Sequence, residues 1–366
     1  MSDITKVSKR WIMFQALSAP AGTNLTPQLL PIAAKLLAST DLLTKKLSSW
    51  YIARYSSANS DVSILAVNTL VTDLHDPNPV VRRLAIHTIS GIHHPELIEH
   101  SITAVNVGLK DSDALVRRTA VLACVRIFRT TPSAVLDGGL VDCLYTQVRD
   151  ADPIVVVDCL DALQEILADE GGVVINRNMA RYLLQRLNSF PDPQCATVLK
   201  YLMKYQACDE AEALDVMNTA DILLDSSNAV VVIATLRCFL NVVSMTGLAH
   251  LRPVVITRAE NSLFRLISSE AHEVVYAVIQ FVREELVGEF ANILSHHYPA
   301  ILCHSNDPAY LKIAKLHLLS DIADSSSVRA VLDELGAQAR TKSPKVIYDV
   351  LLINTVDTMS CCLHLY

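Results

Sequence analysis

Aromatic residues and long apolar runs are both scarce in this 366-residue chain. Aromatics make up 5% of the residues, although 51% are hydrophobic. A helix that crosses a bilayer needs about 18 consecutive apolar residues. The strongest apolar run, 229–245, is interrupted by Arg237 and Asn241, so the sequence predicts no membrane-spanning helix. Few aromatics with abundant Leu, Val and Ala instead suit closely packed pairs of helices.

The chain also lacks paired cysteines and an excess of positive charge. Its nine cysteines are scattered and form no CxxC pair. A free, buried cysteine behaves as a small hydrophobe, and unpaired thiols favour a reduced, cytosolic compartment. The 31 Lys and Arg are outnumbered by 38 Asp and Glu, giving a net charge of −7. This balance argues against nucleic acid as the partner.

Catalytic signatures are absent too. No GxxxxGK, GxGxxG or GxSxG motif occurs. A His-Glu pair occurs once, at His272–Glu273, whereas helical-repeat enzymes with two irons need several such pairs. The spacing of His296, His297, Cys303 and His304 matches no standard zinc motif. We therefore expect a non-enzymatic protein with no catalytic residue, no bound metal and no cofactor.

What the chain does contain is a repeated ten-residue motif. DPNPVVRRLA begins at Asp76, and DSDALVRRTA and DADPIVVVDC follow it after 35 and then 39 residues, at Asp111 and Asp150. More divergent copies begin at Ser189, Asp225, Ser268 and Ser305. Self-similarity at this period is typical of HEAT or armadillo repeats, in which each unit is a pair of helices.

The residue types of the motif explain why it marks a turn between helices. Asp or Asn can cap the next helix by accepting hydrogen bonds from its free N–H groups. Pro79, Pro153 and Pro308 suit the first turn, where no N–H is needed. Loss of a cap costs about 1 kcal/mol, so Asp76→Ala and Pro79→Ala are expected to be mildly destabilising. The predicted turn residues are Asp76, Pro79, Asp111, Asp150 and Pro153.

The predicted fold is therefore all-α. We expect a HEAT/armadillo-type solenoid, a curved right-handed superhelix of antiparallel helix pairs, over residues 27–340. Residues 1–26 are expected to be irregular. Residues 341–366 lose the repeat pattern and end in an apolar stretch, so this tail is not the polar cap that normally closes such an array. The array is thus expected to be curtailed. Glycine-containing loops with positive φ are predicted at 137–139 and 170–178.

Two early helices are predicted, at 41–55 and 61–73. In the first, Trp50 and Tyr51 are expected in the core. The second is apolar on two faces, so one face should pack within the solenoid. The other is either covered by the next repeat or forms a contact surface. The first face contains Val62, Leu65, Ala66 and Thr69, and the second contains Ile64, Val67 and Val71.

Basic residues recur at matching positions of successive repeats. One interpretation is a ladder of arginines that bond to Asp side chains and turn carbonyls of adjacent repeats. The other is an anion-binding edge for phosphate or acidic lipid. The pattern ends at Val156 and Val157. The matching pairs are Arg82–Arg83 and Arg117–Arg118. Lys45 and Lys46 form a further small basic pair, and all six residues make up the predicted basic edge.

Three stretches resemble the trunk of the β-adaptin family, the large β subunits of heterotetrameric vesicle-coat adaptors. They are ILAVNTLVTDLHDPNPVVRRLAIHTI (64–89), GLKDSDALVRRTAVLACVRIF (108–128) and RDADPIVVVDCLDALQEIL (149–167). The last stretch, continued as ADEGGVVINRNMARYLL, is most like β subunits of the fourth adaptor-protein complex. The resemblance covers roughly residues 24–340 and only the N-terminal trunk of the family.

The resemblance implies a cytoplasmic scaffold that sorts cargo on trans-Golgi and coated-vesicle membranes. The implied partners are a second large adaptin, a medium and a small subunit, and an Arf-type GTPase. Membrane association would be peripheral, through the complex. The GTPase contact would lie on the second apolar face of 61–73, at Ile64 and Val67. The alternatives are a generic HEAT scaffold, such as a nuclear transport receptor or phosphatase scaffold, and a helical-repeat metalloenzyme.

Overall fold

Every regular element in the described part of the chain is a helix. The computed structural model describes residues 30–56, 60–92, 94–245, 248–286, 288, 298–304, 306–323 and 328–339. The all-α prediction is confirmed over these ranges. The predicted irregular segment 1–26, the tail 341–366 and the pair His296–His297 lie outside them. The chain divides into two compact units, 1–174 and 175–366.

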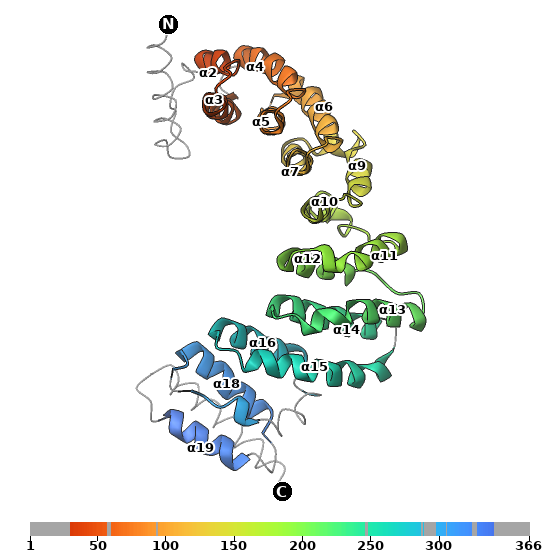
Figure 1. Cartoon of the computed structure of the whole chain (residues 1–366), viewed down its shortest axis with the longest axis vertical. Coiled ribbons are helices and arrows are strands. Elements are labelled where there is room, and N and C mark those ends of the chain that lie inside the picture. Colours follow the sequence, from red (N-terminus) through yellow and green to blue (C-terminus); the bar gives the residue numbers. More distant parts are fainter. Residues whose placement is uncertain are drawn as a thin grey trace. The chain divides into compact units, whose positions relative to one another are not determined.

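The first unit is built from two layers of helices (Figure 1). Within each layer every helix packs against the next. One layer, called here the motif layer because its helices follow the repeated motif, contains α3 (Leu42–Tyr55), α5 (Pro79–Ile89), α7 (Ala114–Thr130) and α10 (Pro153–Ile166). The other contains α2 (Leu30–Leu36), α4 (Ser60–Asp73), α6 (Ile98–Leu109) and α9 (Leu140–Gln147). The short helices η3 (Pro95–Leu97), α8 (Pro132–Leu136) and η4 (Ala168–Glu170) complete the unit.

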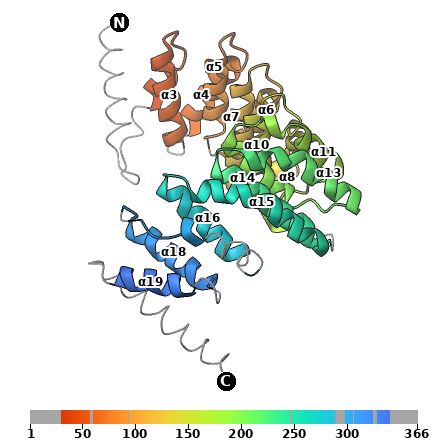
Figure 2. The same cartoon turned by 60° about the horizontal axis from the view of Figure 1, so that its bottom comes forward.

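The second unit continues the alternation of paired helices. The helix pairs α12–α14, α14–α16 and α16–α18 each pack together, and α16 and α18 are seen side by side in Figure 2. The long helices are α11 (Arg177–Gln185), α12 (Asp192–Leu202), α13 (Glu210–Ala220), α14 (Ala229–Met245), α15 (Arg252–Ile267), α16 (His272–Glu285), α18 (Ala309–Asp321) and α19 (Val328–Ala339). The short helices are η5 (Leu187–Ser189), η6 (Asp221–Asp225), η7 (Ala249–Leu251) and η8 (Tyr298–Ala300).

The repeated motif forms the turn before a motif-layer helix, but its first Asp is not the helix cap. The side chain of Asn78 caps α5 by accepting from the N–H of Val80 at 3.0 Å. Asp76 instead accepts from the N–H of Asn78 at 2.7 Å. The reason is positional, since a cap must be the last non-helical residue before the helix. Asp113 and Asp152 are the corresponding caps of α7 and α10, and Asp111 and Asp150 take the place of Asp76.

The proline and glycine predictions are largely confirmed. Pro79 and Pro153 are the first residues of α5 and α10. Pro308 is one position earlier than expected, as the cap residue of α18. Gly139 has φ 68°, and Gly171 and Gly172 also have positive φ.

The interior consists mainly of aliphatic side chains, together with cysteines and a few aromatics such as Tyr51 and Phe281. Cys124, Cys159, Cys195 and Cys238 are all buried. Burial raises the pKa of the Cys124 thiol to about 12, so it stays protonated at neutral pH. This agrees with cysteine as a small core hydrophobe. Within the described ranges no helix has the length and apolar character required to span a bilayer.

Candidate functional site

A ladder of ion pairs connects successive repeats of the first unit. Arg82 donates from Nε and Nη2 to the carboxylate of Asp111, both at 2.7 Å, and from Nη1 to the carbonyl of Asp76 at 2.9 Å. Arg117 repeats this arrangement one unit later, with the carboxylate of Asp150 at 2.6 and 2.8 Å and the carbonyl of Asp111 at 2.9 Å. Each guanidinium thus bonds to its own turn and to the turn of the following repeat.

The ladder begins one repeat earlier, with a lysine. Lys45 lies four residues after the cap of α3, as Arg82 lies four after Asn78, and its Nζ bonds to the carboxylate of Asp73 at 2.6 Å. Hydrogen bonds from Arg82 hold the pKa of Asp111 below its ordinary value, although burial opposes this shift. The equivalent position in the next repeat is the buried Val156, where the ladder ends.

Four of the six predicted basic residues therefore have carboxylate partners. Arg118, the fourth, donates to Asp158 of α10 at 2.6 Å. These contacts are those of a ladder and leave Arg82 and Arg117 little capacity for a further anion. Lys46 and Arg83 differ, because neither has a hydrogen bond or ion pair with any residue that the structure describes. The anion-binding interpretation stays a prediction for these two.

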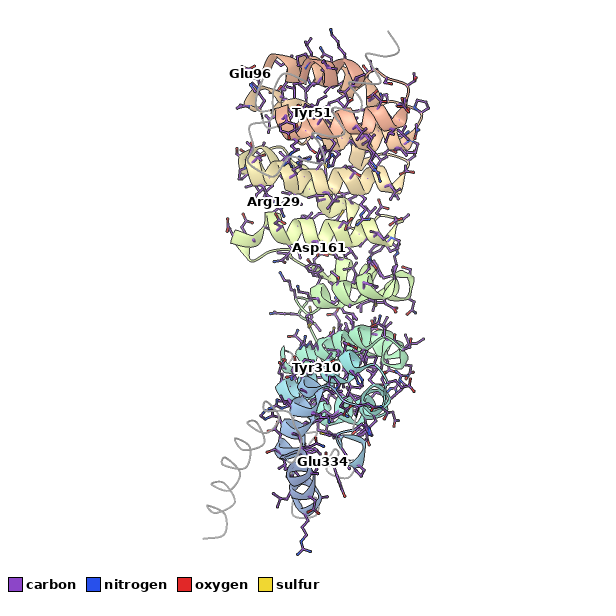
Figure 3. The ribbon with its side chains drawn as sticks, turned by 90° about the vertical axis from the view of Figure 1, so that its left-hand side faces the viewer. Tyr51, Glu96, Arg129, Asp161, Tyr310 and Glu334 are labelled. Atoms are coloured by element: carbon purple, nitrogen blue, oxygen red, sulfur yellow. The ribbon has the colours of Figure 1, made fainter. Side chains whose placement is uncertain are left out.

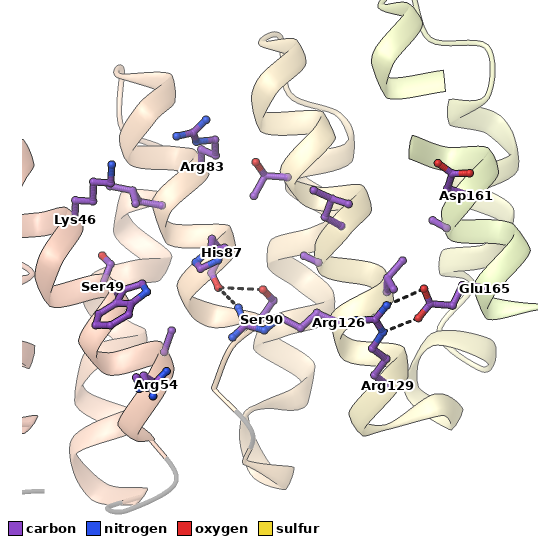
Figure 4. A pocket seen from close by; sticks show the side chains of 18 of the residues that line it. Lys46, Ser49, Arg54, Arg83, His87, Ser90, Arg126, Arg129, Asp161 and Glu165 are labelled. Atoms are coloured by element: carbon purple, nitrogen blue, oxygen red, sulfur yellow. Dashed lines mark hydrogen bonds and ion pairs between the residues drawn. The ribbon is translucent and has the colours of Figure 1, made fainter. Parts of the chain in front are cut away.

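Lys46 and Arg83 both line a groove of about 970 Å³ along the motif layer of the first unit (Figure 4). All four motif-layer helices contribute to its walls. Arg54, Arg126 and Arg129 also line it, so five cations face one hollow. Two acids, Asp161 and Glu165, line its far end and come from α10.

The charge of the groove follows from a segregation of charge between helices. Helices α3, α5 and α7 together carry nine Lys and Arg and no Asp or Glu. Helix α10 is the reverse, with Asp158, Asp161 and Glu165 and no basic residue. The chain as a whole carries a net charge of −7, so these three helices are locally positive within an acidic chain.

Arg126 is held across the C-terminal end of α5. Its Nη1 donates to the carbonyl of His87 at 3.1 Å. A Cβ on Gly91 would lie 2.6 Å from Arg126 Nη2, so glycine leaves the space that the guanidinium occupies. Burial of the His87 ring, together with the positive charges of Arg126 and Arg83, lowers the pKa of His87 below its ordinary value. His87 is therefore neutral at pH 7.

Arg129 makes a two-point ion pair across the groove. Its Nε and Nη2 donate to the carboxylate of Glu165 at 2.6 and 2.9 Å. Glu165 comes from α10 and Arg129 from α7, as Figure 4 shows. This pair joins the basic and the acidic walls of the groove.

Trp50 lies in the groove wall, which corrects the prediction that it belongs to the core. Its side chain is 40% exposed, and the guanidinium carbon of Arg54 lies 5.7 Å from the ring centroid. Tyr51 is fully buried, as predicted. Consecutive helical residues point about 100° apart, so two adjacent aromatics cannot share one face. Tyr51, Arg129 and Asp161 are labelled on their helices in Figure 3.

Helix α4 exposes a different pair of residues from the one predicted for a GTPase contact. Ile64 is 39% exposed and Leu65 is 65% exposed. Val67 is 1% exposed, with Ala66 and Leu70 equally buried beside it. Val67 is thus part of the core, because α4 packs against α2, α5 and α6. A contact surface here would be formed by Ile64 and Leu65.

The second unit contains a smaller polar hollow of about 330 Å³. Glu212 lines it and accepts from Arg177 Nε at 2.6 Å and from the N–H of Cys208 at 2.9 Å. These bonds, that of Cys208 first, lower the pKa of Glu212 to about 2. No group of three metal-ligating side chains occurs among the residues that the structure describes.

Sequence reasoning missed Arg54, Arg126, Arg129 and Glu165, which are separated by up to 111 positions along the chain. No local motif joins them. The signal that could have found them is the absence of acidic residues from alternate helices.

Comparison with known proteins gives a consistent family. A model of the adaptin N-terminal region matches residues 12–363. The chain is 37% identical to the AP-4 complex subunit beta-1 of Mus musculus over 82% of this chain and 40% of that protein. It is 30% identical to the beta-adaptin-like protein A of Arabidopsis thaliana, over 81% of this chain and 36% of that protein. It is 28% identical to the AP-1 complex subunit beta-1 of Mus musculus, over 85% of this chain and 33% of that protein.

The chain thus spans less than half the length of these relatives. Two known structures share its helical-repeat fold. A homology model of the full-length AP-3 complex gives a TM-score of 0.60 at 18% identity, over 94% of this chain and 60% of that one. A structure of Kap95p with RanGDP gives a TM-score of 0.56 at 14% identity, over 96% of this chain and 51% of that one. At these identities the likeness concerns the fold alone.

Proposed function

The chain belongs to the adaptin family, and we propose that it acts as the trunk of a β subunit in a heterotetrameric adaptor complex. The family match over residues 12–363 carries this proposal, together with relatives that are named as β subunits of AP-4 and AP-1. The function would be a non-enzymatic scaffold in vesicle-mediated protein transport.

The proposal extends to the type and place of the complex. Identity is higher to the AP-4 subunit, at 37%, than to the AP-1 subunit, at 28%, which favours an AP-4-like complex. The site of action would be the cytoplasmic face of the trans-Golgi network, where the complex would sort cargo. The partners would be a second large adaptin, a medium subunit and a small subunit.

Co-purification tests the adaptor role. The tagged chain, expressed in its own cells, should recover a medium subunit and another large adaptin in stoichiometric amounts. Recovery of nuclear pore proteins or phosphatase subunits in their place would contradict the proposal. Recovery of an AP-1 medium subunit instead of an AP-4 one would keep the adaptor role and reject the AP-4 assignment.

A contact with an Arf-type GTPase is proposed at Ile64 and Leu65 of α4. Aliphatic side chains suit an apolar partner surface, and both residues are exposed. Ile64→Asp should abolish pull-down by the GTP-locked GTPase and leave the thermal midpoint unchanged, because a charge buried unpaired in a dry interface is strongly unfavourable. Val67→Asp is the matched control and should lower the midpoint, because Val67 is core. Unchanged binding by Ile64→Asp would reject the site.

A further inference from the structure

The groove of the first unit combines unpaired positive charge with an exposed tryptophan. We propose that it binds an extended acidic peptide segment of a partner protein, with Asp and Glu on either side of one aromatic or aliphatic residue. This binding would be a property of the single chain and does not depend on the adaptor role proposed above.

The cations are distributed so that each basic helix offers at least one. Lys46 on α3 and Arg83 on α5 line the groove and have no hydrogen-bond or ion-pair partner within the described ranges. Arg126 on α7 faces the same hollow and is partly buried, which lowers its pKa and strengthens its interaction with an incoming carboxylate. A peptide carboxylate would therefore meet a cation at every step from α3 to α7.

The dimensions suit a short extended chain. Packed helices are about 8–10 Å apart, so α3 and α7, with α5 between them, are separated by about 16–20 Å. An extended peptide advances about 3.3 Å per residue and would cover this distance with about six residues. Carboxylates two or three residues apart would match the spacing of the helices.

Trp50 supplies an apolar anchor at the α3 end. Trp50 is 40% exposed, and the guanidinium of Arg54 lies over its ring, so the exposed part of the side chain is available to an aromatic or aliphatic side chain of the peptide. Leu122, which is 52% exposed, provides a second apolar contact on α7.

The acidic residues of α10 make one end of the groove negative, whereas the rest of it is positive. Asp161 and Glu165 of α10 would repel a carboxylate, so the acidic part of the peptide should lie over α3, α5 and α7. A flat bilayer does not enter a hollow lined by four helices. Charge of both signs in one groove also disfavours the uniform polyanion of a nucleic acid. A short acidic peptide that lies over α3, α5 and α7 therefore fits best.

Fluorescence anisotropy with the full chain tests the proposal. The probe is a fluorescein-labelled peptide of about eight residues, Glu and Asp around one Trp. We expect binding that weakens as salt is raised, and no binding of the same peptide with Gln and Asn in place of Glu and Asp. Equal binding of both peptides would overturn the proposal.

Variants locate the binding. Arg83→Glu should weaken binding about tenfold, since it loses one attraction and gains one repulsion. Lys110→Glu, the same change at an exposed lysine outside the groove, should leave binding unchanged. Equal effects of the two variants would reject the groove as the site. Trp50→Ala should also weaken binding.

One variant should act in the opposite direction. Glu165→Gln removes a groove acid and releases Arg129, so it should tighten binding, an effect that loss of folding cannot produce. Unchanged or weaker binding would contradict the charge argument. Co-sedimentation with phosphatidylserine vesicles that is lost in Arg83→Glu, without any peptide binding, would replace the peptide by a membrane surface.

Discussion

At the scale of single residues, the ladder predicts that replacing one carboxylate destabilises the fold strongly, whereas replacing a nearby carboxylate has little effect. Asp111→Asn should destabilise the chain by about 2 kcal/mol at pH 7, because Asn carries no charge and has one acceptor oxygen where Asp111 has two, so Arg82 loses its ion pair and one of its two hydrogen bonds to this side chain. Asp113→Asn is the matched control. Its side chain caps α7, and Asn caps as well as Asp, so the change should be small.

Chemical denaturation measures both variants. A double-mutant cycle with Arg82→Gln should show that the two ladder substitutions are not additive. Additive effects would mean that Asp111 and Arg82 stabilise the fold independently.

The lowered pKa of Glu212 predicts that the stability of the second unit depends on pH. Its pKa of about 2 in the folded chain lies below the value of about 4.3 expected after unfolding. Its ionised form therefore stabilises the fold fully above pH 4.5, and this contribution is lost as the pH falls toward 2. Glu212→Gln should lower the thermal midpoint at pH 7, and the difference from the parent chain should shrink below pH 4.5.

Glu210→Gln provides the control on the same helix, because Glu210 is exposed. It should change the midpoint little at either pH. A difference between Glu212→Gln and the parent that stays constant from pH 7 to pH 3 would contradict the bonded carboxylate.

At the scale of helices, Gly108 sets the approach of α6 to α5 and α7. A Cβ at this position would lie 2.5 Å from Ile86 Cδ1 and 2.9 Å from Ala120 Cβ. Gly108→Ala should destabilise the chain by about 1–3 kcal/mol through overpacking, despite the better helix propensity of alanine. Thermal unfolding checks this.

Ile86→Val removes the Cδ1 atom that the new methyl group would meet, so it should restore part of the stability lost in Gly108→Ala. Gly336→Ala is the control, since a Cβ there would meet no atom within 4 Å among the residues described. It should be stabilising. Destabilisation of equal size at both glycines would point to backbone conformation instead of packing.

The same scale shows what sequence could predict. The motif fixed the starts of α5, α7 and α10 to within a few residues, because Asn, Asp and Pro act locally on the backbone. The motif did not show whether Asp76 or Asn78 caps α5, because both side chains carry an oxygen that can accept a hydrogen bond and both lie in the same short turn. The exposure of Trp50 and the burial of Val67 could not be predicted, because they depend on which neighbouring helices cover each face.

At the scale of the molecule, fold and family were both predictable, whereas the groove was not. The period of the motif indicated helical repeats, and three stretches indicated adaptins. The groove depends on four helices that the chain brings together over 120 residues, from Lys46 to Glu165. Its cations are unremarkable one by one, and only the folded layer places them on a common hollow.

The ladder also has a consequence for the order of folding during synthesis. Each basic residue has to wait for a carboxylate that is translated later: 28 residues after Lys45, 29 after Arg82 and 33 after Arg117. At about 5–20 residues per second, the ribosome supplies that partner about 1.5–7 seconds later. Until then the most recently formed helix pair carries a cation that has not yet met its carboxylate partner. Docking of the repeats is thereby vectorial, with each unit locked only when its successor has left the ribosome.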